Sequence, residues 1–239
     1  MRASVLMTAA LAPAAIALSI GVAAPAMAAP TTDSTVIASG MEIRRPTTII
    51  TEAKCTLGAV INSTRALTAG HCGKKGEDLF NTNGDKIGTI TTNLISRHAD
   101  IAVVTLLPGQ RVKVDRIDWG AKVKQGEPVS KYGATTGLSR GVVVTPKPQL
   151  IQAVECPLPG PLTIACAFAP PSLLVNQSTL VVEATFRSEG GDSGAGIRAN
   201  GGPIVGILSS KALAATDSEN RAVTRSFYTP VSLVPKSLR

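Results

Sequence analysis

Short runs of Val, Ile, Leu and Thr recur along the chain, and Gly, Pro, Asn or Asp bounds almost every run. Hardly any long segment keeps the 3.6-residue period of an amphipathic helix, so the pattern predicts an all-β fold with little helix. The predicted strands lie at residues 35–38, 47–51, 56–61, 66–68, 87–91 and 101–106, and then at 128–131, 141–145, 178–184, 194–198, 203–209 and 226–230.

The N-terminus has the pattern of a secretory signal peptide over residues 1–28. A basic residue is followed by an apolar stretch, and Ala26-Met27-Ala28 supplies small residues at the cleavage positions. The alternative is a membrane anchor, but Pro13 and Pro25 interrupt the apolar run and no stop-transfer charges follow it. We therefore expect a secreted, extracellular protein without a membrane segment once the signal is removed.

The length that remains suits a β protein with two domains. We expect an N-terminal domain at residues 34–120 and a C-terminal domain at residues 121–239, with a proline-rich loop at 157–171. The chain has four cysteines, and an even number in an exported protein suggests two disulfides. A zinc site is the weaker alternative, since only two histidines are present and they lie far from most of the cysteines.

The formal net charge is +8, which can indicate nucleic acid or an anionic surface. Lys and Arg are scattered along the chain, however, and aromatic residues make up only 3%, which leaves little for base stacking. We expect no nucleic-acid partner. The sequence also has no nucleotide or metal motif, so we expect no cofactor.

Three polar residues occur in settings that suit nucleophilic catalysis. Ser193 lies in a glycine-rich run, His71 lies between Gly70 and Cys72, and Asp100 precedes an apolar run typical of a buried strand. A serine hydroxyl needs an imidazole to take its proton and a carboxylate to orient that imidazole. The order His, Asp, Ser excludes the α/β-hydrolase esterases, which run Ser, acid, His.

Other residues of the same types fit these roles less well. His98 lacks the small-residue setting of His71, and Asp115 and Asp118 lack a following apolar run. Glycines beside the serine allow the backbone N–H groups of Gly191 and Ser193 to turn toward one point, where they could hold an oxyanion.

These segments resemble the chymotrypsin-like (trypsin-fold) serine peptidases, and within them the small secreted bacterial enzymes of streptogrisin and α-lytic type. The resemblance rests on Gly191-Asp192-Ser193-Gly194, Leu67-Thr68-Ala69-Gly70-His71-Cys72, Asp100-Ile101-Ala102-Val103, and a turn similar to Gly-x-Thr-Thr-Gly at Gly133-Ala134-Thr135-Thr136-Gly137. It covers most of the chain after about residue 35. It implies two packed six-stranded antiparallel β-barrels, an active site between them, peptide or protein substrates and a monomer.

The resemblance also implies supporting roles. Cys55 and Cys72 match the family's bridge behind the catalytic histidine, which leaves Cys156 to pair with Cys166. Asp192 matches a buried acid that shapes the oxyanion loop and needs a cationic partner, since an unpaired buried carboxylate is costly. The residue that matches this partner is Lys131, with Arg140 as the alternative.

For the specificity pocket, the resemblance implies that Arg187 lies at the base and that Ser209-Ser210-Lys211 forms a side wall. A preference for Lys or Arg before the scissile bond is excluded, because a substrate cation would lie beside like charge. An acidic or polar side chain paired with Arg187 or Lys211 remains possible, and so does a small apolar one. Glu189 is close enough to neutralise Arg187 or to enter the pocket.

The function that follows is a secreted serine endopeptidase that works through His71, Asp100 and Ser193 and an acyl-enzyme. The alternative is a catalytically inactive binding protein on a protease scaffold. Two features favour this alternative: Ala195 replaces the glycine usual after Gly-Asp-Ser-Gly, and no long propeptide is visible.

Overall fold

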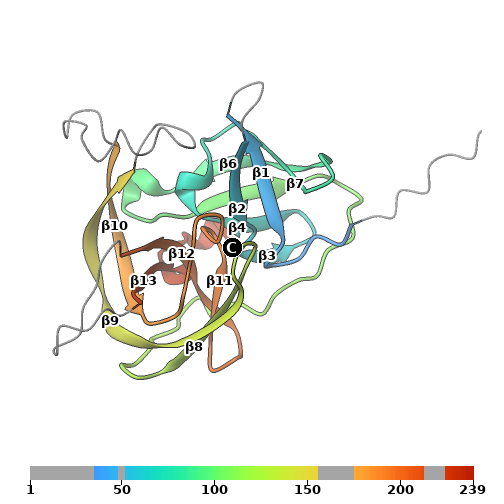
Figure 1. Ribbon diagram of the computed structural model, residues 1–239. Helices are drawn as coiled ribbons and strands as arrows, with labels where there is room; N and C mark the ends of the chain where they lie inside the picture. Colours follow the sequence, from blue (N-terminus) through green and yellow to red (C-terminus); the bar gives the residue numbers. More distant parts are fainter. Residues whose placement is uncertain (1–34, 48–51, 156–174, 213–223) are drawn as a thin grey trace, which may run out of the picture. The chain divides into compact units, whose positions relative to one another are not determined.

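The computed structural model describes residues 35–47, 52–155, 175–212 and 224–239. Within these ranges the chain forms β-strands and short 3-10 turns and no α-helix (Figure 1), which confirms the all-β fold. The signal-peptide segment and the expected Cys156–Cys166 bridge lie outside the described residues. Among the residues that are described, no helix is long and apolar enough to cross a membrane.

The first seven strands form one antiparallel sheet in the order β2-β1-β5-β6-β7-β4-β3. Its strands are β1 (Glu42–Pro46), β2 (Glu52–Thr56), β3 (Ala59–Asn62), β4 (Arg65–Thr68), β5 (Asp78–Phe80), β6 (Lys86–Asn93) and β7 (Ala102–Leu106). The buried positions alternate or run together along these strands, as one expects for a sheet with one face on the core.

This sheet differs from the closed six-stranded barrel that we expected, because its outer strands β2 and β3 are not hydrogen-bonded to each other. The backbone between them has other partners. The N–H of Thr56 donates to the carbonyl of Ser193 at 2.8 Å, and the N–H of Leu57 donates to the carbonyl of Met41 at 2.9 Å. The open edge of the first sheet therefore accommodates the loop that carries the candidate nucleophile.

The last six strands close into a barrel in the order β10-β13-β12-β11-β8-β9. They are β8 (Pro128–Gly133), β9 (Gly137–Glu155), β10 (Val175–Ala184), β11 (Gly196–Ala199), β12 (Ile204–Lys211) and β13 (Ser226–Pro230). This second half has the expected number of strands. Short 3-10 turns at Val231–Leu233 and Lys236–Leu238 follow the barrel, where the resemblance implied a terminal helix.

Strand positions were predicted best where apolar runs are compact. The predictions at 101–106, 203–209 and 226–230 overlap β7, β12 and β13 closely. The segment at 35–38 makes only an isolated bridge, between Ile37 and Val112. β9 is much longer than the predicted 141–145, because it continues through Pro146 and Pro148 while pairing with β10.

The two halves share apolar packing. The larger core cluster combines residues of the first sheet with four from the second half of the chain, namely Ile204, Ile207, Val231 and Val234, each at most 1% exposed. The remaining core lies within the barrel around Phe186, Ile197 and Tyr228. The shared cluster therefore fixes β12 against the first sheet, which matters because β12 contacts the candidate site.

Candidate active site

The turn that carries His71 is held in place by a disulfide and by hydrogen bonds to the backbone on both sides of the histidine. It lies in a 3-10 turn (Gly70–Cys72), and the structure contains the Cys55–Cys72 disulfide that anchors this turn to β2. The side-chain amide of Asn93 donates to the carbonyl of Gly70 at 2.6 Å and to that of Gly73 at 2.8 Å. The ring therefore projects from a rigid turn, and its side chain remains 16% exposed.

Asp100 lies directly before β7 and is 2% exposed. One carboxylate oxygen accepts from the backbone N–H of His71 at 2.8 Å, and the other lies 2.8 Å from Nδ1 of the His71 ring. The hydroxyl of Ser209 on β12 donates to that second oxygen at 2.6 Å. Two contacts from the His71 turn and one from β12 thus hold the carboxylate in place.

The charge state of Asp100 decides which nitrogen of His71 carries the proton. Burial acts to raise the pKa of the Asp100 carboxyl, but the His71 ring and the Ser209 hydroxyl outweigh it, and the pKa lies below its usual value. An ionised carboxylate can only accept, so Nδ1 of His71 is the donor. Nε2 is then the nitrogen able to take a proton.

Ser193 lies in a tight turn that both sheets hold. Its carbonyl accepts from Thr56 N–H, and a sulfur of the Cys55–Cys72 bridge lies 3.7 Å from the same oxygen. The next residue, Gly194, has φ +91° and donates its N–H to the carbonyl of Leu208 at 2.8 Å. A Cβ at Gly194 would lie 2.3 Å from the carbonyl oxygen of Thr56, so only glycine fits.

Three backbone N–H groups of this loop are available to a ligand. Those of Asp192, Gly194 and Ala195 donate to protein carbonyls, whereas among the described residues those of Gly190, Gly191 and Ser193 have no acceptor. Gly191 has φ +95°, and its carbonyl accepts from the Thr56 hydroxyl at 2.8 Å. The loop backbone is therefore fixed, and the two N–H groups expected to form an oxyanion hole, those of Gly191 and Ser193, are among those left unpaired.

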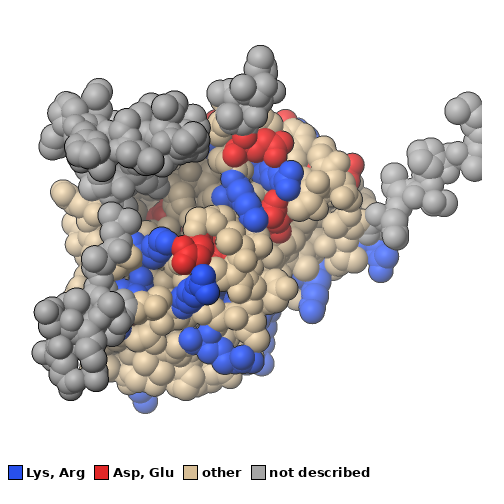
Figure 2. Space-filling model, viewed as in Figure 1, with Lys and Arg blue, Asp and Glu red and all other residues tan. Residues whose placement is uncertain are grey.

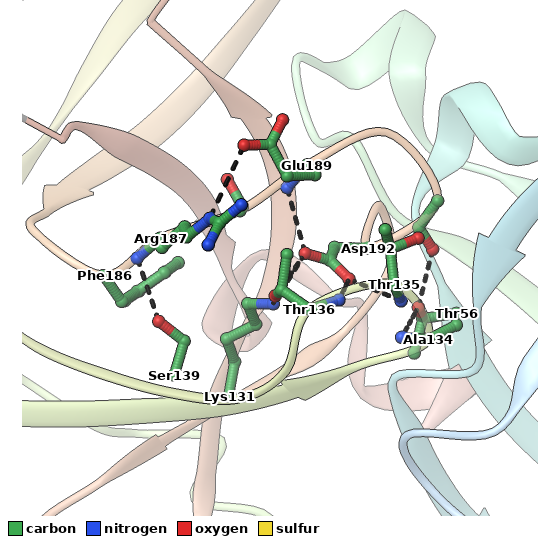
Figure 3. A network of polar contacts seen from close by, with 12 residues as sticks. Thr56, Lys131, Ala134, Thr135, Thr136, Ser139, Phe186, Arg187, Glu189 and Asp192 are labelled. Carbon is green, nitrogen blue, oxygen red and sulfur yellow. Dashed lines mark hydrogen bonds and ion pairs between the residues drawn. The ribbon is translucent and has the colours of Figure 1, made fainter.

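The Asp192 side chain points toward Lys131 on β8 and the Thr135-Thr136 turn (Figure 3). Lys131 Nζ lies 2.7 Å from its carboxylate, and neither side chain is exposed. The other donors to the carboxylate are the backbone N–H groups of Thr135, Thr136 and Glu189 and the Thr136 hydroxyl, at 2.7 to 3.0 Å. Arg140, the alternative partner, is exposed on β9.

This network keeps Asp192 charged. Burial alone would raise the pKa of its carboxyl, but the hydrogen bonds from Lys131 and Thr136 outweigh it and lower the pKa to about 2. The Lys131 ammonium also donates to the Thr136 hydroxyl, so lysine and acid share a neighbour. The loop before Ser193 is thus tied to the Thr135-Thr136 turn by buried charge.

Ala195 fits the position where the family pattern has glycine. It is fully buried and has no positive φ, its N–H donates to the carbonyl of Asp192 at 2.9 Å, and its own carbonyl accepts from Leu208 N–H at 2.8 Å. A methyl group is therefore accommodated without backbone strain. The departure from the family pattern does not distort the loop.

The expected pocket residues occupy other places than the resemblance implied. Arg187 is not at the base of a pocket: its side chain is 71% exposed and faces Glu189, with Nε 3.6 Å from the carboxylate. It lines a cavity of about 410 Å³ with Thr135, Thr136, Leu138, Ser139 and Glu189. Lys211 also pairs with Glu189, and Ser209 points to Asp100.

The reason for the Arg187 discrepancy is local. The backbone N–H of Arg187 donates to the Ser139 hydroxyl at 2.9 Å, which binds this residue to β9 and leaves the guanidinium in solvent. Sequence spacing from the serine alone could not show this. The roles of Thr56 and Asn93 were also missed. Only Thr56 had a signal, since it directly follows Cys55, whose disulfide the resemblance implied.

One group of potential metal ligands lies at the site. Ring nitrogens of His71 and the sulfurs of Cys55 and Cys72 lie within 4.8 Å of one another. Both sulfurs belong to the disulfide, so neither is a thiolate able to bind a metal. These three residues lie close together because the disulfide holds the His71 turn, and they do not form a metal site.

Comparison with known proteins defines the class. A family model described as Trypsin matches residues 35–236, and the chain therefore belongs to the trypsin family of serine-type peptidases. No curated protein matches the chain.

Solved structures of bacterial proteases have the same fold. Thermobifida fusca Protease A is 21% identical, with a TM-score of 0.58 over 82% of this chain and 92% of that one. Nocardiopsis protease (NAPase) is also 21% identical, with a TM-score of 0.58 over 85% and 97%. A glutamic acid specific serine protease is 18% identical, with a TM-score of 0.54 over 82% and 94%.

Proposed function

We propose that this chain is an exported serine endopeptidase in which His71, Asp100 and Ser193 form the catalytic triad. The observation that supports this most is the pairing of Nδ1 of His71 with a buried, ionised Asp100 at 2.8 Å. That pairing leaves Nε2 to act as the base. The Ser193 turn, which Thr56 holds through its backbone, supplies the nucleophile and two unpaired N–H donors.

The chemistry follows from these positions. The Ser193 hydroxyl oxygen attacks the peptide carbonyl carbon while its proton passes to Nε2 of His71, and the N–H groups of Gly191 and Ser193 stabilise the oxyanion. His71 then gives the proton to the leaving amine, and the C–N bond breaks. Water, deprotonated by His71, hydrolyses the acyl-enzyme and restores the serine.

An inactive scaffold is the competing function. Its main support in the sequence was Ala195, but this residue fits the loop without strain. Its second support was that no long propeptide is visible, which leaves activation of the oxyanion loop unexplained. The buried Lys131–Asp192 pair holds this loop from within the chain. The fit of Ala195 and the Lys131–Asp192 pair therefore both favour an active enzyme.

Labelling with a fluorophosphonate probe tests the proposal. We expect the wild type and Ser237→Ala to label at one site and Ser193→Ala not to label; Ser237 is the control, an exposed serine in the last 3-10 turn. Ser193→Ala and His71→Ala should each reduce peptide hydrolysis by several orders of magnitude, and the double variant should be little worse than either. Labelling of Ser193→Ala, or none of the wild type, would contradict the triad.

Export belongs to the same proposal. The Cys55–Cys72 disulfide suits an oxidising compartment. Mass spectrometry of protein from the culture medium should find a chain that begins after Ala28, or later if a short propeptide is removed. A chain retained in the cell with Met1 intact would contradict export.

This chain cannot recognise its substrate in the way described for one of the similar enzymes. One of the solved structures above is described as using a histidine triad to bind a glutamic acid substrate. This chain has two histidines in total, and one of them is the proposed base. A histidine triad is therefore not available here, and the preference must come from other side chains.

A further inference from the structure

A small ion cluster lies between the two segments that flank Ser193. Glu189 belongs to the loop that leads to Ser193, and Lys211 lies at the end of β12, two residues after the serine that binds Asp100. The Glu189 carboxylate pairs with the Lys211 ammonium and lies 3.6 Å from Nε of Arg187. The cluster thus bridges the loop and the strand beside the proposed nucleophile.

The loop that carries Glu189 also contacts β13 in the protein interior. The hydroxyls of Ser188 and Ser226 lie 2.7 Å apart, and both side chains are buried, at 5% and 0% exposure. Ser226 also donates to the carbonyl of Phe186 at 2.8 Å. Ser188 directly precedes Glu189, and Ser226 is the strand partner of Lys211, so this buried contact lies next to the ion cluster and would limit how deep a substrate side chain could enter.

We propose that Glu189 determines substrate specificity by acting as an internal anion that occupies Lys211 and Arg187. The enzyme then prefers a small uncharged residue before the scissile bond and discriminates against acidic residues. This inference rests on the proposed function and goes beyond it, since it assigns the substrate class and the residue that sets it.

Charge explains the discrimination. An acidic substrate side chain must displace Glu189 from Lys211, and Glu189 competes at the high effective concentration of a tethered group. A basic side chain meets two cations against one carboxylate. An uncharged side chain displaces nothing, and the Ser188–Ser226 contact limits its size.

The Glu189 side chain can be changed without disturbing the oxyanion loop. Its backbone N–H, not its carboxylate, donates to Asp192 at 3.0 Å. The side chain is 38% exposed and hydrogen-bonds to Lys211, which together with Arg187 lowers the pKa of its carboxyl. Glu189→Gln therefore removes the charge while the length and the backbone contact remain.

Cleavage of a mixed peptide library by wild type and Glu189→Gln tests the inference. The matched control is Asp78→Asn, which removes one carboxylate of similar exposure, 40%, from an ion pair with Lys86 in the first sheet. We expect the wild type and the control to cleave after small uncharged residues. In Glu189→Gln, cleavage after Glu relative to Ala should rise by about tenfold, as expected when one cation becomes free for the substrate.

A second variant tests the mechanism. The double variant Glu189→Gln with Lys211→Ala should lose most of the gained cleavage after Glu, because the freed cation is gone. A wild type that cleaves mainly after Glu or Lys would overturn the inference, and so would an unchanged profile in Glu189→Gln. Fluorophosphonate titration of each variant first shows whether its serine is active. A variant that labels but whose cleavage profile differs from the expected one contradicts only the role of Glu189, whereas a wild type that does not label contradicts the triad.

Discussion

Lys131→Met is the most informative single substitution, because it removes the buried partner of Asp192 and nothing that contacts the triad. Removing one member of a buried ion pair costs about 3 to 5 kcal/mol. Asp192 keeps four other donors, two of them from the Thr135-Thr136 backbone, so we expect a loss near 3 kcal/mol. The loop should loosen as well, and kcat should fall because the Ser193 N–H is no longer held in position.

The lowered pKa of Asp192 predicts how the stability of the fold changes with pH. This pKa is about 2 in the folded protein against an ordinary 3.8, so the ionised carboxylate stabilises the fold at any pH above the ordinary pKa. That contribution, about 2 kcal/mol, is lost as the pH falls from about 4 to about 2. In Lys131→Met the pKa of Asp192 rises, and the acid loss of stability should begin at higher pH.

Urea unfolding and peptide hydrolysis, each measured from pH 3 to pH 8, provide the assay. Lys75→Met is the matched control, since it removes an exposed lysine in the first half of the chain. Equal unfolding free energies and equal kcat for Lys131→Met and wild type at pH 8 would refute the reasoning. A loss of the same size in Lys75→Met would show that net charge, not the buried pair, is responsible.

Three further substitutions probe the rest of the site. Ser209→Ala removes a hydrogen bond to ionised Asp100 and should lower kcat by about ten- to a hundredfold in steady-state kinetics, whereas replacing the exposed Ser237 by Ala should not. Gly191→Ala places a Cβ 2.4 Å from the Thr135 hydroxyl at φ +95° and should lower kcat by about a hundredfold, with unchanged kinetics as the contradicting result. Replacing Cys55 and Cys72 together by Ala should lower the unfolding free energy in urea by about 3 kcal/mol.

The fold class could be predicted from the sequence because strand and turn signals are local. Runs such as Ile101 to Leu106 contain only buried or strand-forming residues, and the structure places β7 there. The open edge between β2 and β3 could not be predicted, because it depends on Thr56 pairing with Ser193, which is 137 positions away in the chain. The family resemblance implied a closed six-stranded barrel in each half of the chain, and this was right only for the second half.

The candidate site shows the same division. Residue types and their order led to the prediction of His71, Asp100 and Ser193 as a triad, since this chemistry requires an acid, a base and a nucleophile. The structure brings the Asp100 carboxylate within 2.8 Å of the His71 ring. The specificity residues were placed by counting back from Ser193, and this placement was wrong for Arg187. A hydrogen bond from its backbone to Ser139 on another strand decides where its side chain points, and no local pattern encodes that contact.

The loop around Ser193 is held by contacts that all come from inside the described chain. Thr56 on β2 binds the carbonyls of Gly191 and Ser193, while Leu208 on β12 binds Gly194. Lys131 on β8 binds Asp192 at zero exposure. Ile204 and Ile207 belong to the apolar cluster that the two sheets share, so packing of the two halves brings these partners together. The folded chain itself thus supplies the buried cation that pairs with the Asp192 carboxylate.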